Sequence, residues 1–552
     1  MIKDVFNNIF KYHENEKNEF IISDSSNDLP KEEKIDTTKV FPTLSVNIEY
    51  LKSKYNLLIN SDIKTREFIL PIKSKDFKAC LLYIDGMVDG DTINEFILKP
   101  LLLRNSITMQ ENNNSVAISK NISVKKVRKF NLEDFLYNSL IPQNSIYKEN
   151  EFDKIVSKVN AGFCALLVDT LPIIFCIETK GFKGRSVAEP ITESVVKGAH
   201  EAFVENIRIN TSMIRKIINN ENLIIEEVKV GKISKTQVAI CYMKNITNDD
   251  LVAEAKFRIN NLDIDFLLSS GQLEQFIKDN SNSSFPQTIS TERPDKTCNY
   301  LLLGRVVLIV NGSPFAVIIP AIFIDFLTSP EDVNLNYHYA NFLRFIRCLS
   351  IFFALLLPGL YIAITTFHDE LIPSELLFAI ITAREAIPFP IIFEILIMEF
   401  SFELIQEASI RVSSSFSTTV GIIGALILGD AAVSANIVSP ILIIIVAFTG
   451  ICSFAIPDNS LKFSIRMFRF MYIILGYIAG FLGISLGFFV HFIILADYSS
   501  FGLPFFSPYI PFSSFTGNDD LLMKPIWKRE KRSLGLNTKR SEMESHISMK
   551  WK

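Results

Sequence analysis

The sequence is poor in glycine and cysteine. Only 22 of its 552 residues are glycine, which excludes a collagen-like chain. Its seven cysteines are irregularly spaced, include no C-x-x-C pair and have no histidine at metal-ligand spacing. This pattern excludes a disulfide-scaffold protein and argues against a zinc site. We therefore expect buried, reduced thiols that face a reducing compartment.

Motifs for catalysis and cofactor binding are also missing. No G-x-G-x-x-G follows a predicted strand, and neither G-x-x-x-x-G-K-[ST] nor H-E-x-x-H occurs. The six histidines lie far apart, and no two have the spacing of metal ligands on one helix face. We expect no enzyme activity, no cofactor and no metal site. The formal net charge of −4, without a long basic block, argues against nucleic acid as a partner.

Charge is scarce in one part of the chain. Residues 1–341 carry 84 charged side chains, residues 342–497 carry 18, and the tail from 498 onward carries 14. This uneven distribution excludes a single soluble globular domain, and it also excludes a fully disordered chain.

Four stretches in the charge-poor part contain no charged residue. A helix needs roughly 20 apolar residues to cross the hydrocarbon core of a bilayer, and these stretches are of about that length or longer. We therefore predict an all-α polytopic membrane domain over residues 340–500, with four to six spans. The charge-free stretches are 348–368, 412–429, 431–457 and 470–496.

Basic residues around these stretches bear on the orientation of the chain. Arg344 and Arg347 precede the first stretch, a basic cluster at 462–469 precedes the last, and the tail at 501–552 is basic. The positive-inside rule favours the cytoplasmic side for all three groups, but neither four nor five spans satisfies it everywhere. The side of the tail therefore stays open. The first twenty residues lack the apolar region of a secretory signal, so we expect the large N-terminal part to be cytoplasmic.

An acidic stripe interrupts the apolar residues at 388–411. Three of its glutamates are spaced four apart and share one face of a predicted helix. Carboxylates at mid-bilayer cost at least about 2–3 kcal/mol each on insertion scales, so they cannot all face lipid. The helix is either packed against protein or the interface, or it lines an acidic vestibule for cations. The candidate vestibule residues are Glu394, Glu399, Glu403 and Glu407.

A segment rich in small residues follows this helix. Small side chains at helical spacing let helices approach closely, and Asp430 lies between two charge-free runs. Asp430 is either in an interfacial turn that joins two spans or faces water in a pore or hinge. The candidate pore or gate residues are Gly424, Gly429, Asp430, Ser434 and Asn436.

The charged half has a mixed α/β pattern that is more naturally two domains than one. We predict a disordered lead-in over 1–40, one α/β subdomain over 41–150 and a second over 151–335, ahead of the membrane domain and the basic tail. Predicted helices cover 91–103, 191–219, 249–261 and 271–278, and the stretch 104–125 is predicted to be a loop. Predicted strands cover 66–72, 77–85, 163–169, 172–178, 223–231, 236–244, 304–312 and 315–320.

The segment ETKGFKGRSVAEPITESVVKG at 178–198 resembles the G-R-S-x-x-E-P-x-T-E-x-x-V-x-G block of the GerA family of spore germination proteins. GALILGDAAVSANIVSP at 424–440, SFAIPDNSL at 453–461 and FGLPFFSPYIPF at 501–512 match the same family pattern. The collinear matches cover roughly residues 80–527, and the chain is most similar to germinant receptor A subunits. Two local departures, at Phe182-Lys183 and at 198–202, leave the roles of the family's Trp and Arg there without a counterpart.

The resemblance implies a subunit of a nutrient receptor in the inner membrane of spores. It implies partnership with B and C subunits and with further copies of the chain, nutrient sensing through the B subunit, and a cation channel. It also implies two α/β subdomains before the membrane part. A secondary transporter or permease for a small nutrient is the competing class, although repeated membrane halves are not apparent.

The family block also supplies candidate coupling residues in the soluble part. Pro190 suits a first helical turn, and Glu189 and Glu193 would share a helix face with further charged residues spaced four apart. The block is either a capped, solvated helix or a surface that couples the soluble part to the pore. Its candidate residues are Gly184, Arg185, Ser186, Glu189, Pro190 and Glu193.

Overall fold

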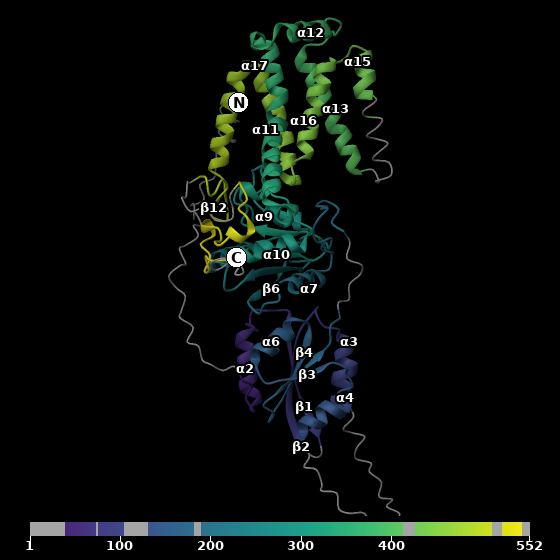
Figure 1. The fold of residues 1–552 in the computed structure, drawn as a ribbon, viewed down its shortest axis with the longest axis vertical. Coiled ribbons are helices and arrows are strands. Elements are labelled where there is room, and N and C mark those ends of the chain that lie inside the picture. The colour runs from purple at the N-terminus through teal and green to yellow at the C-terminus, as the bar shows by residue number, and fades with distance from the viewer. Residues whose placement is uncertain are drawn as a thin grey trace, which may run out of the picture.

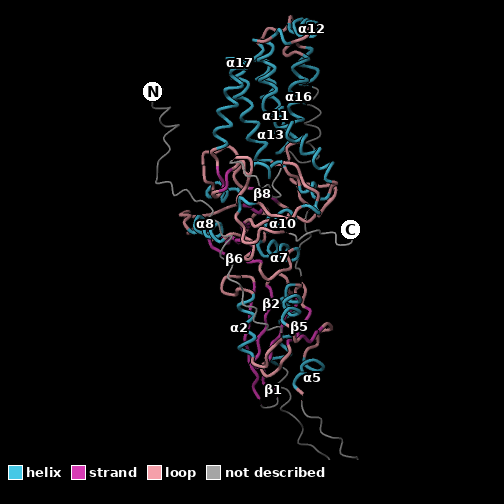
Figure 2. Tube along the Cα trace, turned by 60° about the vertical axis from the view of Figure 1, so that its left-hand side comes forward, coloured by secondary structure: helices cyan, strands magenta, loops and turns pink. Residues whose placement is uncertain are grey.

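The structure, a computed structural model, describes residues 39–72, 75–103, 131–181, 189–411, 424, 427–510 and 521–543. The predicted lead-in over 1–40 lies outside these residues except for its last two positions, and the predicted loop at 104–125 lies wholly outside. Figure 1 shows a long molecule with helices at one end and two α/β units below them along the same axis. Figure 2 shows these helices running side by side along the long axis.

The α/β unit farthest from the helical end contains a five-stranded antiparallel sheet in the order β1-β2-β4-β5-β3. Helices pack on both faces and form two hydrophobic cores, which explains why every residue of β4 is buried. The strands are Ile63–Ile72, Lys75–Ile84, Ile146–Glu149, Phe163–Val168 and Ile174–Glu178. α2 (Leu44–Lys54) and α6 (Phe152–Asn160) cover one face, and α3 (Gly90–Thr92), η1 (Ile93–Leu98), α4 (Lys99–Leu103), α5 (Leu132–Phe135) and η3 (Leu136–Leu140) cover the other.

The division between the two α/β units lies later than the predicted boundary at 150. β4 pairs with β2, and β5 pairs with β3 and β4, so the first sheet extends to Glu178. The second sheet begins at Leu223. The polar stretch at 142–151 resembles a linker in sequence, but β3 lies inside it and closes an edge of the first sheet.

The second unit repeats the five-stranded antiparallel plan in the order β6-β7-β9-β10-β8. Predicted strands at 223–231, 236–244, 304–312 and 315–320 are confirmed. The strands are Leu223–Val230, Thr236–Met243, Ile289–Thr291, Val306–Val310 and Ala316–Ile319. α7 (Ile207–Ile217) and α10 (Pro294–Leu302) pack on one face, and α8 (Asp249–Asn260) and α9 (Ser270–Ile277) pack on the other.

The predicted helix at 191–219 is wrong over its first half. Only α7 is helical there, and residues 191–206 form an irregular segment along β8 and α10. The charged residues spaced four apart therefore do not share a helix face. Backbone groups that a helix would pair internally are instead bound by side chains from another part of the chain, as described below.

The helical part joins the second unit through α11 (Tyr337–Phe367). Among the described residues, α11 and α17 (Asn459–Ala496) are long and apolar enough to cross a membrane, whereas the apolar α16 (Pro440–Phe454) is shorter. α12 (Ser374–Arg384), α13 (Ile391–Arg411) and α15 (Ala432–Ser434) complete this part. The core of the second unit continues between the helices without a break, because Ala354, Leu461 and Tyr472 belong to the same hydrophobic cluster as Ile309 and Leu301.

α11 and α17 approach through glycine. A Cβ on Gly359 would lie 2.6 Å from the backbone oxygen of Tyr472, and a Cβ on Gly476 would lie 2.5 Å from the oxygen of Gly359. Only glycine leaves room for backbones this close, as in small-residue helix contacts generally. Gly359, next to the helix-internal Pro358, therefore serves packing in this structure.

α17 reverses its direction at Ala479 and Gly480. Gly480 has φ +58° and ψ −139°, a conformation that side chains with a Cβ rarely adopt. The Tyr472 hydroxyl lies 3.0 Å from His491 Nδ1, whereas 19 residues of straight helix would separate them by about 28 Å. The charge-free stretch 470–496, predicted as one span, therefore contains a turn. Residues 459–469, which contain the basic cluster ahead of this stretch, form the first turns of α17.

Both ends of α17 lie against the second α/β unit. Ser464 donates a hydrogen bond to the backbone oxygen of Ser284 near the beginning of the helix. After the helix ends, the Ser500 hydroxyl donates to the oxygen of Gln287 at 2.7 Å. The described tail continues on the same unit, where Arg532 donates to the oxygen of Leu302 at 2.7 Å. The tail is thus part of the folded soluble region.

Candidate functional site

The family block from Glu189 onward, together with the residues that follow it to Glu205, lies where the second α/β unit meets the helices. Glu292 holds the first part of this segment. The Glu292 carboxylate accepts hydrogen bonds from the backbone N–H of Ile191 and the hydroxyl of Thr192, both at 2.9 Å. The backbone oxygen of Glu292 accepts the N–H of Phe203 at 2.7 Å. Glu292, which lies between β8 and α10, therefore fixes two distant points of an otherwise irregular segment.

Arg293 holds the middle of the segment. Its guanidinium is fully buried and donates to the backbone oxygens of Glu193 at 3.1 Å and Ala199 at 2.8 Å. Asp295 neutralises it at 2.7 Å. A planar guanidinium can satisfy several carbonyls of an irregular segment at once, which a helix would not require. Glu292 and Arg293 were not predicted as part of this site, because the groups that they bind lie far from them in the sequence.

Glu193 is the residue of the block that reaches toward the helices. Its carboxylate pairs with Lys296 at 2.6 Å and accepts a hydrogen bond from the Thr291 hydroxyl. Asp458, which caps the first turn of α17 by accepting the N–H of Leu461 at 2.9 Å, interacts electrostatically with both Lys296 and Glu193. Burial raises the pKa of Asp458, and the nearby Glu193 adds to that rise.

A cavity of about 230 Å³ separates the block from the beginning of α17. Glu193 and Lys296 line it from the soluble side, and Phe454, Pro457 and Asp458 line it from the turn between α16 and α17. This arrangement places Glu193 in electrostatic contact with the cap of α17 and near the end of α16. The predicted coupling residue Glu193 is therefore at the junction.

The other predicted residues of the block are placed differently. Glu189 and Pro190 lie in the irregular segment, with Glu189 exposed. Gly184, Arg185 and Ser186 lie outside the described residues. Lys216 on α7 pairs with Glu201 at 2.7 Å, so this charge serves the segment's packing against the second unit.

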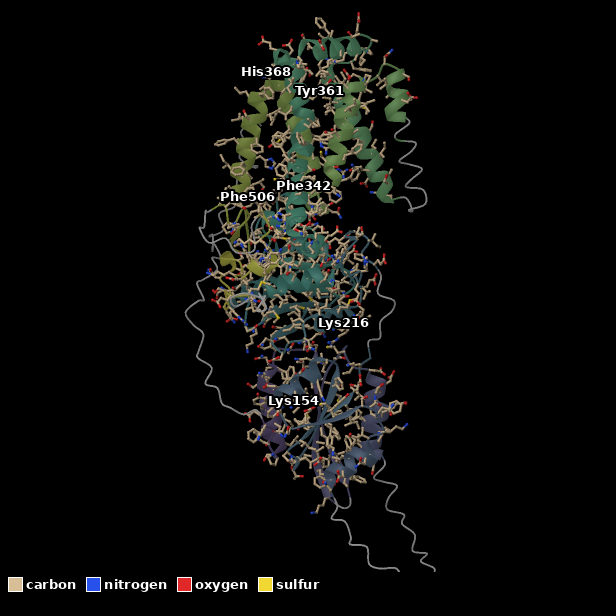
Figure 3. All side chains as sticks on the ribbon, viewed as in Figure 1. Lys154, Lys216, Phe342, Tyr361, His368 and Phe506 are labelled. Carbon is tan, nitrogen blue, oxygen red and sulfur yellow. The ribbon has the colours of Figure 1, made fainter. Side chains whose placement is uncertain are left out.

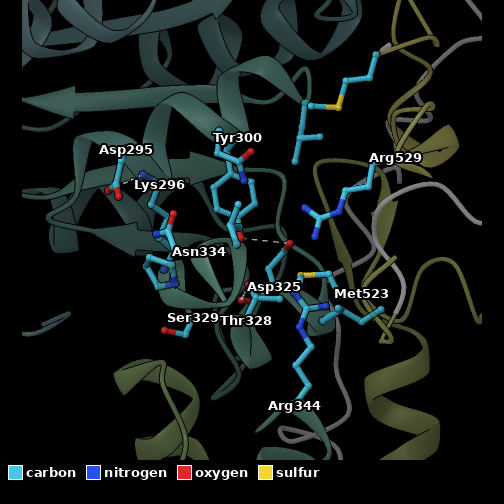
Figure 4. A pocket seen from close by; sticks show the side chains of 16 residues that line it. Asp295, Lys296, Tyr300, Asp325, Thr328, Ser329, Asn334, Arg344, Met523 and Arg529 are labelled. Atoms are coloured by element: carbon cyan, nitrogen blue, oxygen red, sulfur yellow. Dashed lines mark hydrogen bonds between the residues drawn. The ribbon is translucent and has the colours of Figure 1, made fainter. Parts of the chain in front are cut away.

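A second cavity of about 280 Å³ adjoins the first and shares Lys296, Thr328 and Ser329 with it. Figure 4 shows Tyr300 and Asp325 on its wall, with Arg344 from α11 and Met523 from the tail beside them. Soluble unit, helix and tail thus meet around one polar space. Among the described residues, no three histidine, cysteine or carboxylate side chains cluster closely enough to hold a metal ion.

Asp332 ties α11 to the soluble unit. Its fully buried carboxylate accepts two hydrogen bonds from Arg347, at 2.7 and 2.9 Å, and one from Arg344 at 3.2 Å. Both arginines were predicted as interfacial anchors ahead of the first apolar stretch. In the structure they are clamp residues that fix the base of α11.

The four glutamates of the predicted vestibule are paired with arginines. Arg384 binds Glu394 at 3.2 Å, and Arg466 binds Glu403 with an Nε to Oε1 distance of 3.0 Å. Arg469 binds Glu399 at 2.6 Å, with both side chains fully buried, and its Nε donates to the oxygen of Ala354 at 2.8 Å. On the exposed end of α13, Arg411 binds Glu407 at 2.7 Å.

These pairs favour the protein-packed alternative for α13 over a vestibule of free carboxylates. The arginine partners were not predicted, because the sequence shows Arg466 and Arg469 only as part of a basic cluster ahead of the last charge-free stretch. Arg466 and Arg469 are three residues apart, and Glu399 and Glu403 are four apart, so each pair lies on one face of its helix, about one turn apart. Two arginines and two glutamates at this spacing on facing helices are the signal that could have revealed the pairing.

The small-residue segment is only partly described. A Cβ on Gly424 would lie 2.6 Å from Ile405 of α13, so this glycine permits close packing. Gly429, Asp430, Ser434 and Asn436 are exposed, and Asn436 has φ +53° in a turn before α16. An exposed Asp430 in this region fits the interfacial alternative, and its role in a pore stays a prediction.

These features define a class of protein in which the second of two α/β units is clamped directly onto a bundle of apolar helices. The family model described as Bacillus/Clostridium GerA spore germination protein matches residues 49–534. The chain belongs to this family.

Individual relatives span most of the chain. It is 37% identical to "Spore germination protein KA" of Bacillus subtilis (strain 168) over 91% of this chain and 88% of that protein. It is 35% identical to "Uncharacterized membrane protein YfkQ" of the same organism over 89% of this chain and 91% of that protein. Among solved structures, the N-terminal domain of the A subunit of the Bacillus megaterium spore germinant receptor GerK3 is similar, with 28% identity and a TM-score of 0.39. That match covers 52% of this chain and 98% of that chain.

Proposed function

We propose that this chain is the A subunit of a nutrient germinant receptor in the inner membrane of spores. In this proposal it assembles with B and C subunits and with further copies of itself. The B subunit senses the small nutrient, and the assembly of A subunits conducts cations out of the spore core. Membership of the spore germination family supports the receptor role.

The contact of Glu193 and Lys296 with the turn at Asp458 carries the coupling part of the proposal. A shift of the soluble unit would change the electrostatic surroundings of the α17 cap directly, without an intervening linker. The continuous hydrophobic core from β9 to α11 and α17 supports the same path of transmission. Packed, contiguous elements of this kind are what couples distant sites in proteins.

The reversal at Gly480 supports a multi-pass arrangement with the soluble part and the tail on one side. α11 leaves the soluble unit, and the two halves of α17 depart from it and return to it. Arg344, Arg347, the basic beginning of α17 and the basic tail then share that side, as the positive-inside rule favours. We assign this side to the spore core.

Release of K⁺ from spores after addition of nutrient tests the proposal. Spores that lack this chain should lose the release that depends on their receptor, and the Lys296→Met variant should reduce it at least about tenfold at normal protein level, because it leaves Glu193 unpaired at the junction. The Lys216→Met variant is a matched control, since it breaks an exposed pair on the same unit. Retained release without the chain, or nutrient uptake by the chain alone, would contradict the proposal and favour a transporter.

A further inference from the structure

We infer that residues 521–532 lie on the membrane surface and contact the headgroups of anionic phospholipids. This inference rests on the membrane placement in the proposed function. It goes beyond that function because it assigns a lipid-binding role to the C-terminal tail. This stretch, with the sequence LLMKPIWKREKR, is the surface segment.

The surface segment is held against the base of α11. Asn341 accepts the N–H of Met523 at 2.6 Å and donates to its oxygen at 3.1 Å. The ring of Trp527 meets Tyr337, the first residue of α11, edge-on with 6.1 Å between centroids. The position of the segment along the helix axis is therefore fixed by contacts at two points.

The segment exposes large apolar side chains although it lies in a polar part of the chain. Leu522 is 63% exposed, Ile526 51% and Trp527 44%. Lys528 beside them is also exposed, and the segment contains five basic residues against one glutamate. Aromatic and apolar side chains next to lysines are typical of segments at the membrane–water interface.

The depth of the segment matches the headgroup layer. The outward face of α11 becomes apolar at Phe342, which is 58% exposed, and continues with Phe345 at 59%. Figure 3 places Phe342 at the level where the helices meet the soluble part. Tyr337, and with it Trp527, precedes Phe342 by five residues, or about 7.5 Å of helix. The headgroup region on each side of the hydrocarbon core is about 5–7 Å thick.

Charge favours a lipid surface over a neighbouring protein as the occupant. The positive charges of the exposed Lys528 and Lys531 complement the negative charge of anionic headgroups, which attract basic segments beside membrane helices. The exposed apolar face of α11 continues directly from the segment into the span. One boundary between the hydrocarbon core and the headgroup layer thus accounts for both the exposed apolar face of α11 and the exposed side chains of the surface segment.

Tryptophan fluorescence of the full chain tests the inference, because the chain contains only two tryptophans. In the Trp551→Phe variant, reconstituted into vesicles of phosphatidylglycerol and phosphatidylcholine, Trp527 is the single reporter. We expect a nitroxide on the lipid headgroup to lower its emission about twofold or more, a mid-chain nitroxide to act less, and aqueous iodide to act little. The Lys524→Gln/Lys528→Gln variant, or vesicles of phosphatidylcholine alone, should weaken the headgroup quenching.

Leu58→Trp in a background of Trp527→Phe and Trp551→Phe supplies the matched control. Leu58 is fully exposed in the unit farthest from the helices, so its reporter should respond to iodide and not to lipid nitroxides. Quenching of Trp527 by iodide alone would show a segment in water, and quenching by neither agent would show one covered by protein. Either result overturns the inference while leaving the proposed function intact. Extraction of the chain from vesicles by alkaline carbonate would instead overturn the proposed membrane placement, and the inference with it.

Discussion

Three of the four glutamates on α13 are paired with arginines from other helices. Glu399 and Arg469 are both fully buried, and their pairing joins α13 to α17. A buried pair is weak support for stability by itself, but loss of one partner leaves an uncompensated charge. The glutamates that looked like a cation vestibule in the sequence therefore have a structural partner each.

Substitution of one partner of the Glu399–Arg469 pair should cost more than substitution of both. Glu399→Leu leaves Arg469 buried and unpaired, and we expect a loss of about 3–5 kcal/mol in the free energy of unfolding. The double variant Glu399→Leu/Arg469→Leu should recover most of that loss. Thermal denaturation of the full chain in detergent measures both. A loss for the double variant equal to the sum of the losses for Glu399→Leu and Arg469→Leu alone would show that the pair is not coupled.

The junction contains a carboxyl group with a pH-dependent contribution to stability. Burial raises the pKa of Asp458 above its ordinary value. A carboxyl group with a raised folded-state pKa stabilises the fold fully below its unfolded pKa, and this contribution is lost as the pH rises through the folded pKa.

The Asp458→Asn variant should therefore gain stability relative to the wild type as the pH rises. Asparagine can still cap the first turn of α17, so the comparison isolates the charge. We expect the difference in denaturation midpoint between variant and wild type to be largest near about pH 7 and to shrink toward about pH 4. A difference that is constant across this range would contradict the raised pKa.

Among the elements, α17 departs most from its sequence pattern. A charge-free run of 27 residues predicts a single long helix, because apolar periodicity carries no information about where a buried helix turns back. The structure folds it into two antiparallel halves at Gly480. The run contains four glycines, Gly476, Gly480, Gly483 and Gly487. The turn is at Gly480, which lies against Phe367, whereas Gly483 and Gly487 pack against Leu475. These contacts are made in the folded structure and cannot be read from the sequence of the run.

Gly480→Ala should weaken this turn. The backbone conformation is strained for any residue with a Cβ, and the added atom would lie 3.1 Å from Phe367. We expect a destabilisation of about 1–3 kcal/mol, seen as a lower denaturation midpoint of the full chain in detergent. Gly90→Ala is the matched control, because its Cβ would meet no atom within 4 Å. A midpoint for Gly480→Ala that equals that of Gly90→Ala would rule out a strained turn.

Whether another element could be predicted depends on whether the residues that determine it are close together in the sequence. Strands such as β7 and β9 were found because their apolar runs are local signals, as were α8 and α9 with their short helical patterns. The segment at 191–206 was mistaken for a helix because its charges fall four apart. Its conformation depends on Glu292 and Arg293, about 90 to 100 residues later in the sequence, which no local pattern contains.

At the scale of the whole molecule, both ends of α17 and the base of α11 lie at the soluble unit. Under the proposed membrane placement, this arrangement puts the basic clusters and the described tail on one side of the membrane. It predicts that the N-terminal part and the described tail lie on the same side of the membrane.

Protease accessibility in membrane vesicles of one orientation tests that prediction. Epitope tags on the two ends of the chain should be cleaved together in vesicles that expose the cytoplasmic face, and protected together in vesicles that enclose it. An epitope inserted after Glu370, beyond the far end of α11, should behave in the opposite way. Opposite behaviour of the two terminal tags would require an odd number of crossings.

The clamp at Asp332, the cap at Asp458 and the hydrogen bond of Ser500 to Gln287 give the bundle three separate tethers to the second α/β unit. Three tethers that do not lie on one line define a plane. Any tilt or twist of the soluble unit must then change the relative heights of α11 and the two halves of α17, since no flexible hinge among the described residues separates them. Under the proposed membrane placement, such a movement would reach the membrane helices directly.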